Sequence, residues 1–192
     1  MKKIIIIFLI LFFIQPAFSK PGTIVSYTID AEKNAYLHNN KGIEYVSERQ
    51  YYAAIQEFKI AISLNPKKQS TAVYFNNLGK VYMMIGYPQL AQDCFENSIK
   101  QYSLNFEYYK NLADCYKELG LIDKKLNFYK NEAKQKPMYN ILVGLLEERQ
   151  GNSKKAIITF DEFANSEPDL IITPAIKSYT KELVKSLEIK ND

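Results

Sequence analysis

The chain has 192 residues, of which 47% are hydrophobic, a proportion sufficient for a buried core. Its 25 lysines and arginines include Lys2 and Lys3 at the extreme N-terminus, and without these two the remaining 23 face 21 acidic residues. The resulting net charge of +2 excludes the strongly basic surface that nucleic-acid binding requires.

Residues 1–19 have the composition of a secretory signal peptide. Two lysines precede an unbroken apolar run over residues 4–14, and Ala17 and Ser19 are the small residues that a cleavage site after Ser19 requires. This run of 11 residues is much shorter than the roughly 20 residues of a membrane-spanning helix. We therefore expect export, with a periplasmic or secreted protein after cleavage near Ser19. An uncleaved signal anchor is the alternative, and it is the one membrane attachment that the sequence suggests.

Residues 20–34 form a leader. After Pro21 and Gly22, the apolar residues Val25, Tyr27 and Ile29 alternate with polar ones. Both a short strand that pairs with a partner and a flexible segment fit this pattern, and so close to a chain terminus we favour the flexible segment.

Four copies of one pattern occupy residues 35–168, and as repeats they cover 35–68, 72–105, 106–137 and 137–170. Each copy has a small residue followed sixteen positions later by an aromatic one. The small residues are Gly42, Gly79, Ala113 and Gly144, and the aromatic residues are Phe58, Phe95, Tyr129 and Phe160. Successive small residues are 37, 34 and 31 positions apart, with a mean of 34.

Each copy predicts two amphipathic helices, because its apolar residues recur at intervals of three and four. In the second copy, Leu78, Val81 and Tyr82 mark the first helix and Phe95 and Ile99 the second. The small residue allows the two helices to approach closely, and the aromatic side chain fills the space beside it. A single hairpin cannot bury its apolar face, so several must stack into a continuous core.

The turns between these helices follow one rule with one departure. Gly86, Gly120 and Gly151 each lie seven residues after the small residue of their copy, where a left-handed backbone is expected at the end of a helix. Arg49 takes this place in the first copy. A left-handed arginine costs about 1–2 kcal/mol, so the turn either carries this cost or is built differently.

A last amphipathic segment covers residues 173–190. Thr173 is suited to begin a helix and Pro174 to occupy its first position, and Ile176 and Tyr179 start an apolar stripe. The pattern predicts a helix that covers the end of the stack.

The 34-residue period and its residue pattern resemble the tetratricopeptide repeat family. The resemblance implies an all-α fold, a right-handed α-solenoid of about four helical hairpins with a C-terminal capping helix. It also implies a concave groove, lined by the first helix of every repeat, in which protein partners bind.

The sequence has few residues of the kinds that form disulfides, bind metals or act in catalysis. Cys94 and Cys115 lie on consecutive expected helices, where either a disulfide or two buried free thiols can form. His38, the single histidine, holds a position that the repeat fills with a large residue, which favours a structural role over catalysis or metal binding. The chain has no Gly-rich phosphate loop, no paired-thiolate motif and no serine elbow. We therefore expect no enzyme, no cofactor, no metal and no small-molecule substrate.

The resemblance also indicates which side chains point into the groove. They lie three and two residues before the small residue and one, four and five after it. Eight polar ones are candidate peptide-binding residues: Asn39, Asn40, Asn76, Asn77, Lys80, Lys110, Asn111 and Asp114. An amide both donates and accepts, so the asparagines can hold the backbone of an extended peptide while the lysines take acidic groups. The alternative for the asparagines is a structural bond to a neighbouring helix.

In the fourth copy the same positions are apolar, namely Ile141, Leu142 and Leu145. They either form an apolar subsite or are covered by the C-terminal helix, and we expect them to be covered.

These observations favour a non-catalytic scaffold or adaptor for protein–protein interaction, exported from the cytoplasm, that binds a protein or an extended peptide in the concave groove. The alternative is a structural subunit of a larger cell-envelope or secretion assembly that docks through its convex face or its ends.

Overall fold

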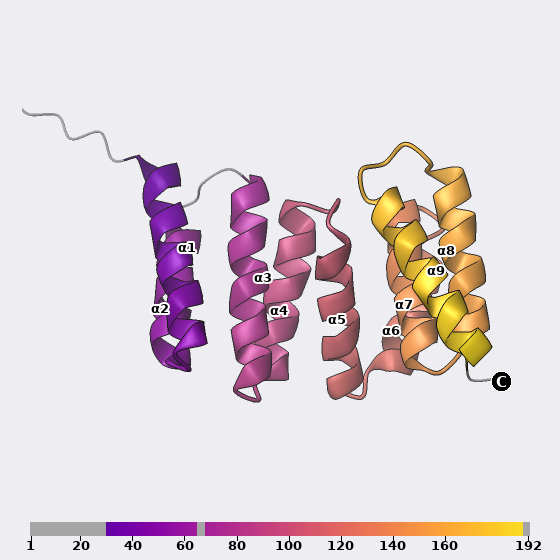
Figure 1. The fold of residues 1–192 in the computed structure, drawn as a ribbon, viewed down its shortest axis with the longest axis horizontal. Helices are drawn as coiled ribbons and strands as arrows, with labels where there is room; N and C mark the ends of the chain where they lie inside the picture. Colours follow the sequence, from indigo (N-terminus) through magenta and orange to yellow (C-terminus); the bar gives the residue numbers. More distant parts are fainter. Residues whose placement is uncertain (1–29, 65–67, 190–192) are drawn as a thin grey trace, which may run out of the picture.

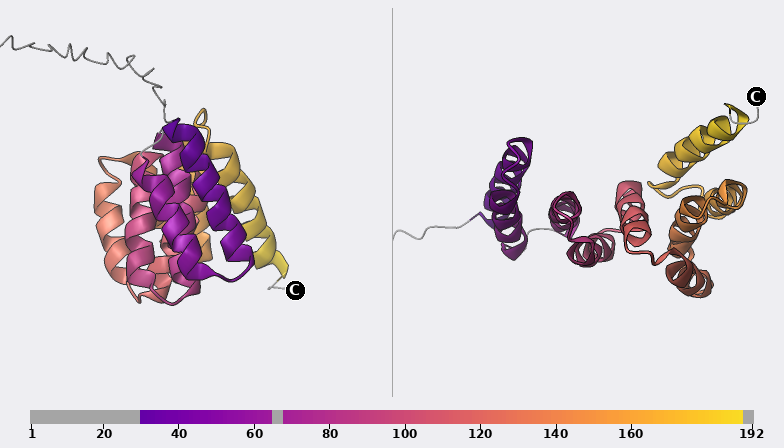
Figure 2. Two further views of the ribbon diagram at one scale, coloured as in Figure 1. Left: turned by 90° about the vertical axis from the view of Figure 1, so that its left-hand side faces the viewer. Right: turned by 90° about the horizontal axis from the view of Figure 1, so that it is seen from below.

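The computed structural model describes residues 30–64 and 68–189, and the secondary structure in these ranges is entirely helical (Figure 1). The elements are α1 (Ala31–Ser47), α2 (Tyr51–Ser63), α3 (Lys68–Met84), α4 (Pro88–Gln101), α5 (Phe106–Glu118), α6 (Ile122–Glu132), η1 (Pro137–Tyr139), α7 (Asn140–Arg149), α8 (Ser153–Ser166) and α9 (Thr173–Ile189). The hairpins stand in a row in chain order, and α9 packs on the last one (Figures 1 and 2). Over the described residues, the expected all-α solenoid of four hairpins and a C-terminal helix is confirmed.

Some predictions fall on other residues. The signal peptide at 1–19, residues 20–29 of the leader and residue 190 of the C-terminal segment lie outside the described ranges. Within residues 30–64 and 68–189, every helix is too short or too polar to cross a membrane.

Two helices begin earlier than the repeat spacing indicates. α1 starts at Ala31, inside the leader expected over 20–34, because Asp30 caps it by accepting a hydrogen bond from the backbone N–H of Lys33 at 2.9 Å. α3 starts at Lys68, four residues before the expected repeat boundary at residue 72. The repeat spacing locates the middle of a helix, where the small residue lies, and carries no information on an additional turn at the N-terminus.

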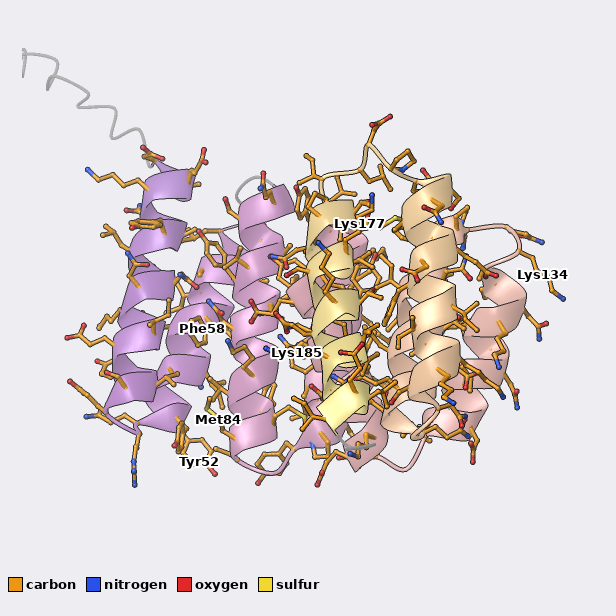
Figure 3. All side chains as sticks on the ribbon, turned by 45° about the vertical axis from the view of Figure 1, so that its right-hand side comes forward. Tyr52, Phe58, Met84, Lys134, Lys177 and Lys185 are labelled. Carbon is orange, nitrogen blue, oxygen red and sulfur yellow. The ribbon has the colours of Figure 1, made fainter. Side chains whose placement is uncertain are left out.

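Three of the four hairpins close on a glycine. The ring of Phe58, in the core of the first hairpin (Figure 3), lies against Gly42. Phe95 and Phe160 lie in the same way against Gly79 and Gly144. A β-carbon at Gly144 would be 2.4 Å from Cε1 of Phe160, far inside van der Waals contact. The absence of a side chain is therefore what brings the two helices of each of these hairpins together.

The outer side of the first hairpin is polar. In later hairpins, the positions one before and two after the small residue are buried and apolar, for example Leu112 and Cys115. In the first hairpin these positions are Lys41 and Glu44, so α1 has the polar cover that a terminal repeat needs.

Buried Glu57 joins the two helices of this first hairpin. Its Oε2 lies 2.6 Å from Nδ1 of His38, and its Oε1 lies 3.0 Å from Nζ of Lys41. The hydrogen bond from His38, together with Lys41, lowers the pKa of Glu57 although burial acts in the opposite direction. His38 thus has a partner within the fold, in agreement with the structural role expected for it.

All four hairpin turns have the same backbone conformation. The second residue after the end of each first helix has a positive φ, namely 61° at Arg49, 78° at Gly86, 66° at Gly120 and 92° at Gly151. In the first turn, the N–H of Arg49 donates to the carbonyl of Val46 at 3.0 Å and that of Gln50 to the carbonyl of Tyr45 at 2.8 Å, which is a Schellman motif. Of the two alternatives for Arg49, the structure has the left-handed one.

Replacing Arg49 by glycine should raise the free energy of unfolding by about 1 kcal/mol, since glycine adopts this φ without a steric cost and loses part of the gain to its greater freedom in the unfolded chain. Urea unfolding followed by circular dichroism measures the change. Gly86→Arg is the matched control, and it should lower the free energy of unfolding by a similar amount. If both replacements change stability in the same direction, the strain assigned to Arg49 is wrong.

Candidate functional site

The first helices of three hairpins, α1, α3 and α5, share one side that is not covered by other helices, and we call it the first-helix face. It is formed by the positions six and two before the small residue and one and five after it, which are about one helical turn apart. Its members are Tyr36, Asn40, Ile43, Ser47, Val73, Asn77, Lys80, Met84, Glu107, Asn111, Asp114 and Glu118. Three of its four positions, two before and one and five after the small residue, are among those that the repeat resemblance directs into the groove.

The candidate asparagines form bonds between neighbouring repeats. Nδ2 of Asn77 on α3 donates to Oδ1 of Asn39 on α1 at 2.9 Å, and Nδ2 of Asn111 on α5 donates to Oδ1 of Asn76 on α3 at 2.8 Å. Asn39 and Asn76 are only 5% and 4% exposed, so they join adjacent first helices and are not accessible to a partner. Both residues thus form the kind of bond to a neighbouring helix that the structural alternative expects.

Asn77 and Asn111 keep part of their hydrogen-bonding capacity. Each amide group has two N–H donors and a carbonyl oxygen, and the bond to the neighbouring repeat uses one N–H. Both residues are half-buried, while Asn40 is exposed and its Oδ1 is 3.4 Å from Nδ2 of Asn39. On the side chains of both Asn77 and Asn111, one N–H and the carbonyl oxygen form no hydrogen bond with the residues that the structure describes.

The charged candidates are paired across the same helices. Nζ of Lys80 lies 3.3 Å from Oε1 of Glu107 on α5. Nζ of Lys110 lies 5.7 Å from the centre of the Phe106 ring and 5.8 Å from that of Tyr179 on α9, close enough for cation–π contacts. An acidic partner group would have to compete with these contacts.

The C-terminal end of the first-helix face is closed by α9. Ile141, Leu142 and Leu145 on α7 are 0%, 1% and 0% exposed, and they share a core with the fully buried Ile176 of α9. The expectation that these apolar residues are covered agrees with the structure. The accessible face therefore ends at α5.

A hydrogen-bonded cluster around Arg149 holds this closure. Its Nε donates to Oδ1 of Asp114 on α5 at 2.6 Å, and its Nη1 donates to Oε2 of Glu148 at 2.6 Å and to the hydroxyl of Tyr179 at 3.0 Å. The Tyr179 hydroxyl itself donates to Oε2 of Glu148 at 2.6 Å. Asp114, a candidate for peptide binding, is thus occupied in joining α5 to α7.

The pKa values of the cluster follow from these contacts. Burial would lower the pKa of Arg149, but the hydrogen bonds to Asp114 and Tyr179 raise it above its ordinary value. Burial, together with the hydrogen bond to Glu148, raises the pKa of Tyr179 to about 12. The guanidinium therefore stays charged and the phenol neutral near neutral pH.

Apolar residues of the first-helix face were missed among the candidates. Tyr36, Ile43, Val73 and Met84 are 58%, 49%, 38% and 55% exposed, and they lie on α1 and α3. Ile43 and Met84 hold positions that the repeat resemblance already directs inward. Tyr36 and Val73 lie seven residues before such a position, and two helical turns separate residues on the same side of a helix. Extending the stripe by two turns would have found them.

The two cysteines are free and buried. The thiol of Cys115 donates to the carbonyl of Pro88 at 3.1 Å, and burial raises the pKa of Cys94 to about 12 and that of Cys115 to about 11. Of the two alternatives, the structure has the free thiols, and both are protonated near neutral pH.

The stack of hairpins defines the class of the protein as an α-solenoid of helix–turn–helix repeats. Residues 35–68, which cover most of the first hairpin, match the model of the tetratricopeptide repeat. This match and the common geometry of the four turns support the tetratricopeptide repeat family for this chain.

Known proteins with similar sequence or fold include several repeat proteins. Photosystem I assembly protein Ycf3 of Prochlorococcus marinus (strain NATL1A) is 24% identical over 155 residues, which cover 79% of this chain and 76% of that protein. A tetratricopeptide repeat protein from Parabacteroides merdae ATCC 43184 has a similar fold with a TM-score of 0.50, at 19% identity over 81% of this chain and 62% of that chain. YrrB, described as a TPR protein with an unusual peptide-binding site, has a TM-score of 0.45 at 20% identity, over 75% of this chain and 74% of that one.

Proposed function

We propose that the protein is an exported, non-catalytic scaffold that binds a protein partner on the first-helix face. Tetratricopeptide repeat proteins bind protein or peptide partners, and the family match supports the same class of function here. The name of the Prochlorococcus relative describes an assembly protein, which is consistent with a scaffold. Export is inferred from the signal-peptide pattern of residues 1–19.

One observation supports this location of the binding site. Four large apolar side chains, Tyr36, Ile43, Val73 and Met84, are exposed on one side of two neighbouring helices. Exposed apolar side chains that gather on one face are typical of an interaction surface, and aromatic and Met side chains are enriched in the centres of interfaces. The amides of Asn77 and Asn111 lie on the same face and can bind the backbone of the partner.

This proposal modifies the role of the two lysines. The sequence assigns Lys80 and Lys110 to acidic groups of a partner, but both already have partners within the fold. We therefore propose that apolar contacts provide most of the affinity and that the amides fix the direction of the bound segment. A partner segment with alternating apolar side chains fits this arrangement.

The double variant Tyr36→Ser/Met84→Ser should reduce capture of the partner by about tenfold or more, because it removes two large apolar contacts of the kind that dominate interface energies. The measurement is crosslinking to the purified chain in an extract of the native cell, with quantitative mass spectrometry of what is captured. Both residues are more than half exposed, so the helical content should not change.

The matched control is Tyr52→Ser/Ile158→Ser, which removes one exposed aromatic and one exposed aliphatic side chain from the second helices α2 and α8. Capture of the same partner should be unaffected by this control. If the first-helix variant captures the partner as well as the unmodified chain does, the proposed site is wrong.

The second helices support one alternative. Each of them carries a large exposed apolar residue: Tyr52, Leu90, Phe128 and Ile158 are 71%, 46%, 51% and 56% exposed. This distribution favours a subunit that docks into a larger assembly through its convex side. The same experiment separates the two functions, because under the alternative the control variant, rather than the first-helix variant, loses the partner.

A further inference from the structure

The third hairpin differs from the other three in the residues at which the two helices of a hairpin come into close contact. Ala113 takes the place of the glycine, Tyr129 the place of the phenylalanine, and Lys125 the place of an alanine that the others have at Ala54, Ala91 and Ala156. In the other hairpins a β-carbon at the glycine would collide with the ring. With a β-carbon present at Ala113 and a long side chain at Lys125, α5 and α6 cannot approach as closely.

The hairpin is accordingly open. α6 packs mainly on α7 rather than on α5, and Figure 1 shows it displaced from α5 towards the α7 side. The opening leaves a pocket of about 570 Å³ between α4, α5, α6, η1 and the start of α7. It is lined by Glu96, Ile99, Lys100, Ser103, Tyr109, Leu112, Lys125, Phe128, Tyr129, Lys136, Met138, Tyr139 and Leu142. We call it the third-repeat pocket, and it shares no residue with the first-helix face.

Aromatic rings form one wall of the third-repeat pocket. The ring centres of Phe128 and Tyr129 are 5.0 Å apart, and those of Tyr129 and Tyr139 are 5.1 Å apart, both within the range of favourable aromatic pairs. Phe128 is 51% exposed at the edge of this wall. An inserted aromatic side chain would continue the row of rings and cover Phe128.

The charge of the pocket is positive. Its single carboxylate, Glu96, is occupied: Oε1 accepts hydrogen bonds from the Tyr116 hydroxyl at 2.7 Å, from Nε2 of Gln92 at 3.0 Å and from Nζ of Lys125 at 3.3 Å. Lys125 also lies over the ring of Tyr116, with its Nζ 4.5 Å from the ring centre. Glu96 and Lys125 therefore balance each other inside the fold.

Two lysines remain for a ligand. Lys100, on the last turn of α4, is exposed and forms no ion pair with the residues that the structure describes. Lys136 is 61% exposed. Its Nζ is 3.7 Å from Oε2 of Glu132 and 5.6 Å from the centre of the Tyr139 ring, and contacts of such an exposed group contribute little. An aromatic wall next to two available ammonium groups is complementary to an aromatic side chain that is flanked by carboxylates.

We propose that the third-repeat pocket is a second binding site, which takes an acidic segment of a partner protein by inserting one aromatic side chain between α4 and α6. The flanking carboxylates bind Lys100 and Lys136. The pocket is larger than one side chain, so it accommodates the adjoining backbone as well. The first-helix face then stays available for another partner, and the protein can join two proteins.

The test uses fluorescence, because the chain has no tryptophan and a tryptophan in a peptide reports binding directly. The probe is the blocked peptide acetyl-Asp-Glu-Trp-Glu-Asp-amide, titrated with the protein. We expect a blue shift of the tryptophan emission on binding, with an affinity that falls as salt is added. The double variant Lys100→Glu/Lys136→Glu should weaken binding by about tenfold or more, and Phe128→Ala by about fivefold.

Three controls belong to this titration. Lys177→Glu/Lys185→Glu changes the net charge equally on α9 (Figure 3) and should leave binding unchanged, as should the first-helix variant Tyr36→Ser/Met84→Ser. The proposal is overturned if acetyl-Lys-Lys-Trp-Lys-Lys-amide binds equally well or if the Lys100/Lys136 variant keeps full affinity. It is also overturned if N-acetyltryptophan alone binds as tightly as the peptide, since the pocket would then select a small aromatic acid and not a protein segment.

Discussion

Truncation of Phe160 to alanine should lower the free energy of unfolding by about 3–5 kcal/mol, the cost of removing a fully buried aromatic side chain. Phe160 is 0% exposed and lies on Gly144, where the two helices of the fourth hairpin are in closest contact. Its ring also lies 6.3 Å from that of Phe106 on α5 and 5.9 Å from that of Tyr179 on α9, both edge to face. One side chain therefore joins four helices.

The loss of stability in the Phe160 variant should appear first at the C-terminal end of the stack. Each repeat contacts only its neighbours, so a cavity in the fourth hairpin weakens α7, α8 and α9 before it affects α1 and α2. Urea unfolding followed by circular dichroism measures the total change, and hydrogen exchange of backbone amides locates it.

Phe128→Ala is the matched control for the same chemical change. Phe128 is half exposed, so its truncation should cost less than about 1 kcal/mol. If Phe160→Ala proves no more destabilising than Phe128→Ala, the closing role of the aromatic ring on the glycine is wrong.

The three closed hairpins were predictable because short-range sequence patterns indicate their helices and turns. A glycine sixteen residues before a phenylalanine, as at Gly79 and Phe95, indicates both the pairing of two helices and the point of closest approach. Three turn glycines indicated where the first helices end, and the structure has positive φ at each of them. Periodicity thus predicted the architecture of the described residues, but not the first turns of α1 and α3, which depend on capping and local packing.

The first-helix face was predicted only in part. The position of a residue in the repeat indicates the direction in which its side chain points, but not the group to which that side chain bonds. Asn39 and Asn76 are directed towards the next repeat, and the distance between first helices allows each to bond to an amide on that repeat. A sequence pattern does not contain this distance. The third-repeat pocket was missed although its signal was visible: Lys125 stands where the other copies have alanine, beside Ala113 in place of glycine.

Replacing Arg149 by methionine should lower the free energy of unfolding by about 2–3 kcal/mol, the magnitude for hydrogen bonds between charged groups that are partly buried. The side chain of Arg149 is 14% exposed and bonds to Asp114, Glu148 and Tyr179, which lie on α5, α7 and α9. Methionine keeps much of the apolar stem but leaves the carboxylate of Glu148, which is 20% exposed, without its cation.

This variant should also alter the first-helix face. With Arg149 absent, α9 loses the hydrogen bond between Arg149 and Tyr179 and keeps the one between Tyr179 and Glu148. Its backbone amides should therefore exchange faster with solvent than they do in the unmodified protein. Loosening of α9 should uncover Ile141 and Leu145, so the apolar face extends by one repeat and should bind a hydrophobic dye more strongly. Lys181→Met, at an exposed position of α9, is the control and should change stability by less than about 0.5 kcal/mol. Equal stability and equal amide exchange of α9 in the Arg149 variant and in the unmodified protein would show that apolar packing alone holds α9 in place.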